Sequence, residues 1–164
     1  MNQTAETTDN TLKVGDYAPE FMMPTDGEGE ISLGALKGKN VVLYFYPKDD
    51  TPGCTKEAQK FTELSDQFNR ASTVILGVSK DNVSSHDTFK AKYCIPFQLA
   101  YDETGTVCEA YGTWVEKSMY GKKYMGIQRD TFLINDEGKI AAIWRKVKVE
   151  GHAQEVLEAA RKLR

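Results

Sequence analysis

The chain has 164 residues, of which 40% are hydrophobic and 27% charged, and its formal net charge is -3. This length predicts one globular domain with a sizeable core. The negative balance gives no electrostatic basis for binding nucleic acid or an anionic membrane, and no apolar run approaches the roughly 18 residues of a membrane span. We therefore expect neither a nucleic-acid nor a membrane partner.

The N-terminal segment is polar and lacks the basic start and apolar core of a signal peptide. We expect a disordered or extended tail over residues 1–11 and a single domain over residues 12–164. Three cysteines without a Cys-x-x-Cys pair or a Cys/His cluster predict no disulfide framework, no metal site and a reducing, cytoplasmic compartment. His86 and His152 stand alone in the sequence, and we expect both on the surface.

The first predicted elements lead to a buried strand. Apolar segments at 21–23 and 31–33 flank a turn rich in Gly and acidic residues, which predicts a hairpin. Ser32 is expected to cap a short helix that ends at Gly38. Residues 41–46 are apolar or aromatic throughout, which is typical of a strand buried on both faces.

A turn follows this strand, and a helix follows the turn. Thr51 is the predicted N-cap and Pro52 the first helical residue, so Cys54 falls in the first turn of the helix. There the free backbone N–H groups and the positive end of the helix dipole favour thiolate over thiol. The Thr51 hydroxyl can donate to that thiolate or to the group that the thiolate attacks. These features predict a reactive cysteine.

The remaining pattern predicts a mixed α/β fold, in which sites form beyond the carboxyl ends of the parallel strands. A β-branched run at 73–79 completes a parallel strand–helix–strand unit. In chain order the other predicted elements are a helix at 85–93, a strand at 97–101, a brief helix at 104–111, a hairpin of strands 130–135 and 140–147, and a helix that buries residues 153–163 on one face.

Arg129 lies just before the hairpin strand that starts at Asp130. If that strand runs antiparallel to 41–46, it begins at the edge of the sheet where Cys54 lies. A guanidinium there would stabilise the thiolate and donate to a polar substrate. An arginine at the end of a strand is otherwise a solvated charge, and the residues alone leave both readings open.

Two segments resemble those of the peroxiredoxins, and in particular of the bacterioferritin comigratory protein, or peroxiredoxin Q, subfamily. The resemblance runs from about Val14 to the C-terminus. The first segment is Tyr44-Phe45-Tyr46-Pro47-Lys48-Asp49 with Thr51-Pro52-Gly53-Cys54-Thr55, and the second covers 114–132, with Glu116-Lys117, Met119-Tyr120-Gly121-Lys122, Tyr124-Met125-Gly126-Ile127 and Arg129-x-Thr131-Phe132.

The resemblance implies a thioredoxin-like α/β fold with a central mixed β-sheet flanked by helices and an N-terminal β-hairpin extension. It implies a thiol peroxidase for hydrogen peroxide and organic hydroperoxides, with no cofactor, acting as a monomer or weak dimer. By family role Cys54 is the peroxidatic nucleophile, Thr51 and Arg129 activate it and the peroxide, and Pro47 shields the sulfur. Glu57 is expected to orient Arg129.

The sequence leaves open which thiol reduces the resulting sulfenic acid. Many relatives carry a resolving cysteine five residues after the peroxidatic one, where this chain has Gln59, or at a position that corresponds to Lys90. Cys94 is a possible resolving cysteine, although we expect it roughly 14 Å along its helix at about 1.5 Å per residue. Cys108 is expected in the core. We therefore favour a one-cysteine cycle that uses thioredoxin or a small-molecule thiol.

Other functions on this scaffold would need other residues near Cys54. A dithiol oxidoreductase would need a second cysteine near Cys54, and a copper chaperone would need a further cysteine and a histidine there. A redox sensor or holdase that uses oxidised Cys54 without efficient turnover is the remaining alternative.

Overall fold

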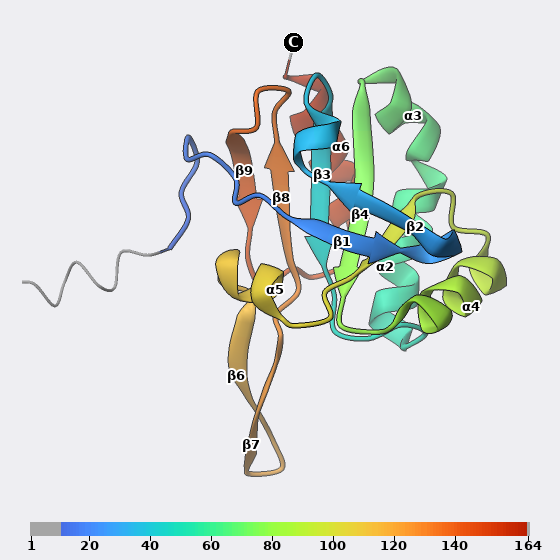
Figure 1. Ribbon diagram of the computed structural model, residues 1–164, viewed down its shortest axis with the longest axis vertical. Helices are drawn as coiled ribbons and strands as arrows, with labels where there is room; N and C mark the ends of the chain where they lie inside the picture. The colour runs from blue at the N-terminus through green and yellow to red at the C-terminus, as the bar shows by residue number, and fades with distance from the viewer. Residues whose placement is uncertain (1–10, 164) are drawn as a thin grey trace, which may run out of the picture.

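The computed structural model describes residues 11–163, so nearly all of the tail expected over residues 1–11 lies outside the described residues. Its centre is a seven-stranded sheet in the order β2-β1-β5-β4-β3-β8-β9 (Figure 1). The strands are β1 (Met22–Thr25), β2 (Gly29–Ser32), β3 (Asn40–Phe45), β4 (Thr73–Ser79), β5 (Gln98–Tyr101), β8 (Asp130–Ile134) and β9 (Ile140–Trp144).

Parallel and antiparallel pairs are combined in this sheet. β3, β4 and β5 run parallel, whereas β8 pairs antiparallel with β3 and β9 antiparallel with β8. All six residues of β3 are buried, as its unbroken apolar run predicts. The mixed sheet, the flanking helices and the N-terminal hairpin of β1 and β2 confirm the predicted fold class.

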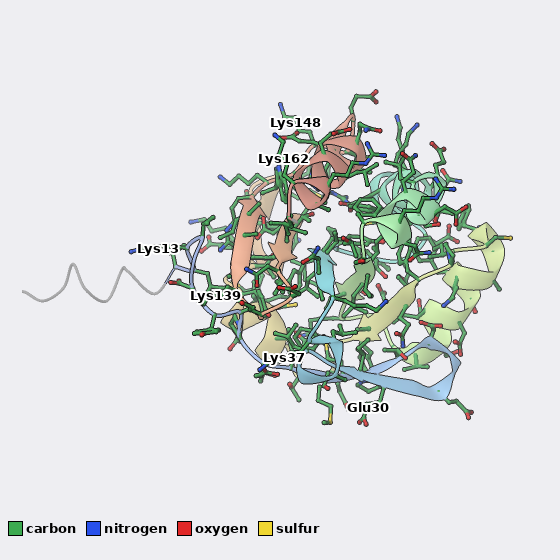
Figure 2. The ribbon with its side chains drawn as sticks, turned by 90° about the horizontal axis from the view of Figure 1, so that it is seen from above. Lys13, Glu30, Lys37, Lys139, Lys148 and Lys162 are labelled. Atoms are coloured by element: carbon green, nitrogen blue, oxygen red, sulfur yellow. The ribbon has the colours of Figure 1, made fainter. Side chains whose placement is uncertain are left out.

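The two faces of the sheet carry separate cores, because side chains alternate along β3. Val42 and Tyr44 join the core beneath α2 (Pro52–Glu63), α3 (Ser65–Arg70), α4 (Val83–Tyr93) and α6 (His152–Arg161). Val41, Leu43 and Phe45 face the other core, which the N-terminal segment and α5 (Thr106–Ala110) cover. Figure 2 shows six charged side chains that point outward, namely Lys13, Glu30, Lys37, Lys139, Lys148 and Lys162.

Several local predictions are confirmed with small shifts at their ends. Thr51 and Pro52 occupy the N-cap and first position of α2. Ser32 Oγ accepts from the Ala35 amide at 3.2 Å and begins a short 3-10 helix, η3 (Gly34–Leu36). A second 3-10 turn, η2 (Asp26–Glu28), joins β1 to β2. No helix within residues 11–163 is long and apolar enough to cross a membrane.

A second sheet was not among the predicted elements. β6 (Trp114–Met119) and β7 (Lys122–Ile127) pair antiparallel and form a two-stranded ribbon that projects from the body of the molecule (Figure 1). Tyr120 and Gly121 form its turn with positive φ angles of 52° and 80°, the conformation that tight hairpins require. Lys, Glu, Ser and Gly dilute the apolar alternation, which explains why the pattern gave no strand signal.

Candidate active site

Cys54 lies in the first turn of α2, at the carboxyl end of β3. The N-cap Thr51 has an extended backbone, and its carbonyl accepts the first helical bond from the Thr55 amide at 2.8 Å. The amides of Gly53 and Cys54 precede that bond and have no helical acceptor, so they are free for a ligand. Cys54 itself is only 2% exposed. The thiol is therefore held at the positive end of a helix and largely shielded from water.

Arg129 reaches this sulfur, as the antiparallel placement of β8 predicts. Asp130 pairs with Phe45 at the end of β3, which brings the preceding residue to the start of α2. Arg129 Nη2 donates to Cys54 Sγ at 3.5 Å, and Nη1 donates to Glu57 Oε1 at 2.6 Å. Cys54 and Glu57 are three residues apart on one helix face, so a single planar guanidinium spans both.

Glycine at position 53 makes room for this guanidinium. A Cβ added there would lie 3.0 Å from Arg129 Nη2, closer than ordinary van der Waals contact. The absence of a side chain at Gly53 therefore allows Arg129 to lie along the first turn of α2.

Glu57 is buried beside the arginine, and only one of its two carboxylate oxygens has a hydrogen-bond partner within the described residues. It is 1% exposed, and within the described residues its Oε2 has no hydrogen-bond partner. Burial raises the pKa of Glu57 from 4.5 to about 7, and the Arg129 guanidinium limits this rise. The carboxyl group therefore changes charge near neutral pH while in contact with the residue that contacts Cys54.

The pH dependence of stability is set in part by two buried groups that act in opposite directions. Between pH 4.5 and about 7 the folded state keeps a proton on Glu57 that the unfolded chain has lost, so Glu57 lowers the free energy of unfolding as the pH rises. Burial lowers the pKa of His152 from 6.5 to about 4. Between about pH 4 and 6.5 the unfolded chain carries a proton on His152 that the folded state lacks. His152 therefore raises the free energy of unfolding as the pH rises through this range.

We expect Glu57→Gln to separate these contributions. Relative to the wild type, the free energy of unfolding of this variant should increase by about 3 kcal/mol from pH 4.5 to 7, at about 1.4 kcal/mol per pKa unit. Denaturant titrations at successive pH values measure the difference. Glu150→Gln is the control, because the Glu150 side chain is 87% exposed. Parallel curves for wild type and Glu57→Gln would contradict the raised pKa of Glu57.

Two further predicted site residues lie less directly against the sulfur. The Thr51 hydroxyl donates to the Lys48 carbonyl at 2.8 Å, so its single proton is not directed at Cys54 and it makes no capping bond in the described chain. The expected donation from Thr51 to the thiolate is therefore not made in this conformation, and its donation to the group that the thiolate attacks stays a prediction. Pro47 is exposed on the loop between β3 and α2.

The other two thiols differ in their surroundings. Cys108 is fully buried, and burial together with Asp102 raises the pKa of its thiol, which makes it a poor nucleophile. Cys94 is exposed at the C-cap of α4. Tyr93 Oη donates to Asp50 Oδ1 at 2.8 Å and Lys92 Nζ to Asp50 Oδ2 at 2.9 Å. The end of α4 that carries Cys94 is thus tied to the loop that precedes Thr51.

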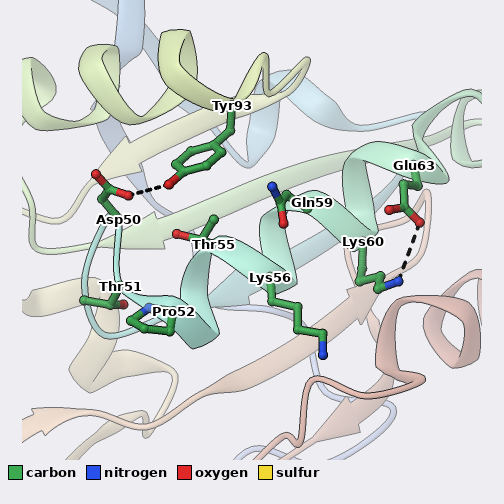
Figure 3. Close-up of a pocket in the computed structure, with 9 residues that line it drawn as sticks. All are labelled: Asp50, Thr51, Pro52, Thr55, Lys56, Gln59, Lys60, Glu63 and Tyr93. Atoms are coloured by element: carbon green, nitrogen blue, oxygen red, sulfur yellow. Dashed lines mark hydrogen bonds and ion pairs between the residues drawn. The ribbon is translucent and has the colours of Figure 1, made fainter.

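A pocket of about 450 Å³ lies beside the first turns of α2, next to the end of α4 (Figure 3). Gln59, the position at which many relatives carry a resolving cysteine, is among its lining residues, whereas Cys54 is not. The lining residues are Asp50, Thr51, Pro52, Thr55, Lys56, Gln59, Lys60, Glu63 and Tyr93. The pocket is therefore a neighbour of the site rather than the site itself.

The expected surface placement of the histidines is wrong. His152 is 4% exposed and its Nε2 lies 2.8 Å from Thr131 Oγ1. His86 is completely buried, with Nδ1 at 2.8 Å from Asp49 Oδ2 and Nε2 at 2.9 Å from the Ala100 carbonyl. Their partners are distant in sequence, so no local pattern indicated these contacts. Among residues 11–163 no cluster of three or more His, Cys, Asp or Glu side chains could hold a metal ion.

Comparison with known proteins places this chain in a family. The model of the AhpC/TSA family matches residues 14–143. The peroxiredoxin bcp of Coxiella burnetii is 57% identical over 148 residues, which cover 90% of this chain and 97% of that protein. Xanthomonas campestris peroxiredoxin Q has a similar structure, with a TM-score of 0.83, 46% identity, and coverage of 86% of this chain and 89% of that one.

A further similar structure is the trapped intermediate/ligand complex of the Xanthomonas campestris bacterioferritin comigratory protein, described for its alkyl peroxide reduction activity. It has a TM-score of 0.83 and 45% identity, and the match covers 86% of this chain and 90% of that one. The resemblance noted in the two sequence segments is thereby confirmed. The chain belongs to the AhpC/TSA family and is a peroxiredoxin of the bacterioferritin comigratory protein, or peroxiredoxin Q, group.

Proposed function

We propose that this thiol peroxidase reduces hydrogen peroxide and organic hydroperoxides through a sulfenic acid at Cys54, and that thioredoxin or another external thiol recycles it. The observation that carries the proposal is the guanidinium of Arg129, which contacts both Cys54 Sγ and Glu57 at the start of α2. The alkyl peroxide reduction described for the Xanthomonas relative supports organic hydroperoxides as substrates.

The proposed chemistry uses groups already in place. The Cys54 thiolate attacks one peroxide oxygen, the O–O bond breaks, and the other oxygen leaves as an alkoxide or hydroxide that takes up a proton. Arg129 and the free amides of Gly53 and Cys54 donate to the charge that develops. The cysteine gains the oxygen and becomes a sulfenic acid, while the peroxide becomes an alcohol or water.

The remaining predicted residues have supporting roles in this proposal. Glu57 holds one arm of Arg129 so that the other arm points at the sulfur. Thr51 acts once its hydroxyl turns from the Lys48 carbonyl toward the bound peroxide, and Pro47 limits access of water from the loop. The Arg129 side chain is 18% exposed, so an incoming peroxide meets the guanidinium before the buried sulfur.

Gly53→Ala provides a test that separates activity from stability. The added methyl group meets Arg129 Nη2 at 3.0 Å and should displace the guanidinium, which we expect to lower kcat/KM for hydrogen peroxide about tenfold. Alanine has the higher helix propensity, by about 0.5–1 kcal/mol, but the displaced guanidinium loosens its contact with the buried Glu57, so we expect little net change in the free energy of unfolding. Peroxide consumption and denaturant titration measure the two effects. An active variant with wild-type kcat/KM would show that Gly53 is not needed for the approach of Arg129.

We propose a one-cysteine cycle for recycling, with Cys94 as the second choice of resolving thiol. The raised pKa of Cys108 and its complete burial argue against that residue. Mass spectrometry after one equivalent of peroxide distinguishes the two cycles. A sulfenic acid trapped at Cys54 supports the external thiol, whereas a Cys54–Cys94 disulfide within one chain contradicts it.

Turnover separates the enzyme from a redox sensor or holdase. With excess dithiothreitol the enzyme should consume many equivalents of hydrogen peroxide per chain, whereas a sensor stops after one. Loss of a single equivalent would refute the peroxidase cycle. We further propose a cytoplasmic location and a monomer or weak dimer; the three unpaired thiols suit a reducing compartment.

A further inference from the structure

The β6–β7 ribbon exposes an unusual share of apolar side chains. We use the term ribbon surface for Met119, Tyr120, Tyr124 and Met125 with Lys117, Lys122 and Lys123. The tip residue Tyr120 is 98% exposed, and Met119 and Met125 are at least half exposed. In the described chain only three other large apolar side chains are similarly exposed, namely Val14, Tyr17 and Met22. Such a concentration marks an interaction site.

The base of the ribbon is held firmly against the body of the molecule. Ile127 is 3% exposed, and Trp114 packs against the core with Lys80 4.5 Å above its ring. The Gln128 amide donates to the Thr113 carbonyl at 2.7 Å, and Thr113 Oγ1 donates to the Gln128 carbonyl at 2.6 Å. The projecting end is thus carried on an ordered support and presents its side chains in a defined arrangement.

The ribbon is continuous with the active site. A single residue, Gln128, separates the end of β7 from Arg129. Lys117 lies across the backbone of β7, with its Cδ 3.3 Å from where a Cβ of Gly126 would be. Burial and the nearby Arg129 lower the pKa of Lys117, while Cys54 acts to raise it, which places Lys117 toward the site. The base of the ribbon therefore adjoins the arginine that contacts Cys54, and a partner that covers the ribbon down to its base reaches the side of the molecule that carries the site.

The charge of the ribbon indicates the chemistry of that partner. Residues 114–127 carry three lysines and one glutamate, a net charge of +2, whereas the whole chain carries -3. Opposite charge across an interface steers association and sets its orientation. The complementary surface is an apolar patch with carboxylates around it.

We propose that the ribbon surface is the docking site for the protein dithiol that reduces oxidised Cys54. This inference rests on the proposed peroxidase function. A thiolate of the partner attacks the Cys54 sulfur, the sulfenic oxygen takes up a proton and leaves as water, and a mixed disulfide forms. The second thiolate of the partner then attacks its own sulfur in that bond. Cys54 leaves as thiolate, and the two electrons come from the partner, which becomes a disulfide.

Two ribbon variants test the proposal. The first, Tyr120→Ser with Met125→Ser, removes apolar side chains, and the second, Lys122→Glu with Lys123→Glu, reverses two charges. Turnover of hydrogen peroxide is measured with thioredoxin and, separately, with dithiothreitol. We expect kcat/KM for thioredoxin to fall at least about tenfold in both variants, since each removes part of the apolar contact or reverses charge. Turnover with dithiothreitol should stay unchanged, because a small dithiol needs no docking surface.

Met22→Ser is the matched control, because it removes a similarly exposed apolar side chain, 67% exposed, from β1 of the seven-stranded sheet, whereas the ribbon is a separate two-stranded sheet. Wild-type kcat/KM for thioredoxin in both ribbon variants would overturn the proposal. The proposal is also overturned if these variants lose binding to anionic vesicles while their turnover with thioredoxin is unchanged. The ribbon would then be a membrane contact. Wild-type protein that turns over with dithiothreitol but not with thioredoxin also overturns docking and leaves the peroxidase intact. Absence of turnover with either reductant instead refutes the proposed function.

Discussion

Cys54→Ser is expected to lower peroxide consumption to the uncatalysed background, a loss of at least about a thousandfold in kcat/KM. A serine hydroxyl is a much weaker acid and nucleophile than a thiol, and an alcohol cannot take oxygen from a peroxide to form an acid that thiols reduce. The Arg129 arm that donates to Sγ at 3.5 Å can donate to a hydroxyl oxygen, so the variant should remain folded. Loss of hydrogen peroxide in the presence of dithiothreitol measures the effect.

Cys108→Ala is the matched control for this experiment. It removes a thiol that is fully buried on the opposite face of the sheet and should leave turnover near the wild-type value. Near-ultraviolet circular dichroism of both variants confirms that each is folded. Residual turnover in Cys54→Ser, or its disappearance in folded Cys108→Ala, would assign the chemistry to another sulfur.

Arg129→Lys is expected to lower kcat/KM for hydrogen peroxide about a hundredfold, although it preserves the positive charge. The planar guanidinium reaches Glu57 with one nitrogen and Cys54 with the other. The single ammonium nitrogen of lysine cannot hold both contacts in this geometry. The donor that stabilises the leaving oxygen is then displaced, which costs about 10²–10³ in comparable sites. Steady-state kinetics at saturating reductant measure the change.

Arg161→Lys provides the same substitution on the surface, where Arg161 pairs with Glu158 at 3.1 Å on α6. Its kcat/KM should match the wild type. Equal rates for Arg129→Lys and Arg161→Lys would mean that charge alone suffices at position 129 and that the two-armed geometry is unimportant.

Most of the candidate site could be predicted from the sequence because that part of it is local. A buried strand, a turn and a capped helix are contiguous from residue 41 onward, and each has its own pattern of residues. Arg129 is distant in sequence, yet the antiparallel register of β8 on β3 brings it to the same edge; topology made this approach possible to foresee, and the family resemblance decided between the two readings of Arg129.

The features that sequence reasoning missed depend on tertiary contacts. The pair of His86 and Asp49 joins residues 37 apart, and neither residue has a local pattern that distinguishes it from a surface residue. The Thr51 hydroxyl has a choice of acceptors, and the path of the loop gives it the Lys48 carbonyl. The ribbon escaped prediction because both its faces lie largely in water, so it lacks the apolar alternation that burial imposes.

The two adjacent aspartates of the active-site loop fasten opposite ends of one helix. Asp49 accepts from Ser85 and contacts His86 near the start of α4, and Asp50 accepts from Lys92 and Tyr93 near its end. These contacts couple the loop to both ends of α4, so a local opening of the loop would have to break contacts at each end of that helix. In the proposed cycle, a reductant that draws the nearly inaccessible sulfur outward would therefore also strain the contacts at both ends of this eleven-residue helix.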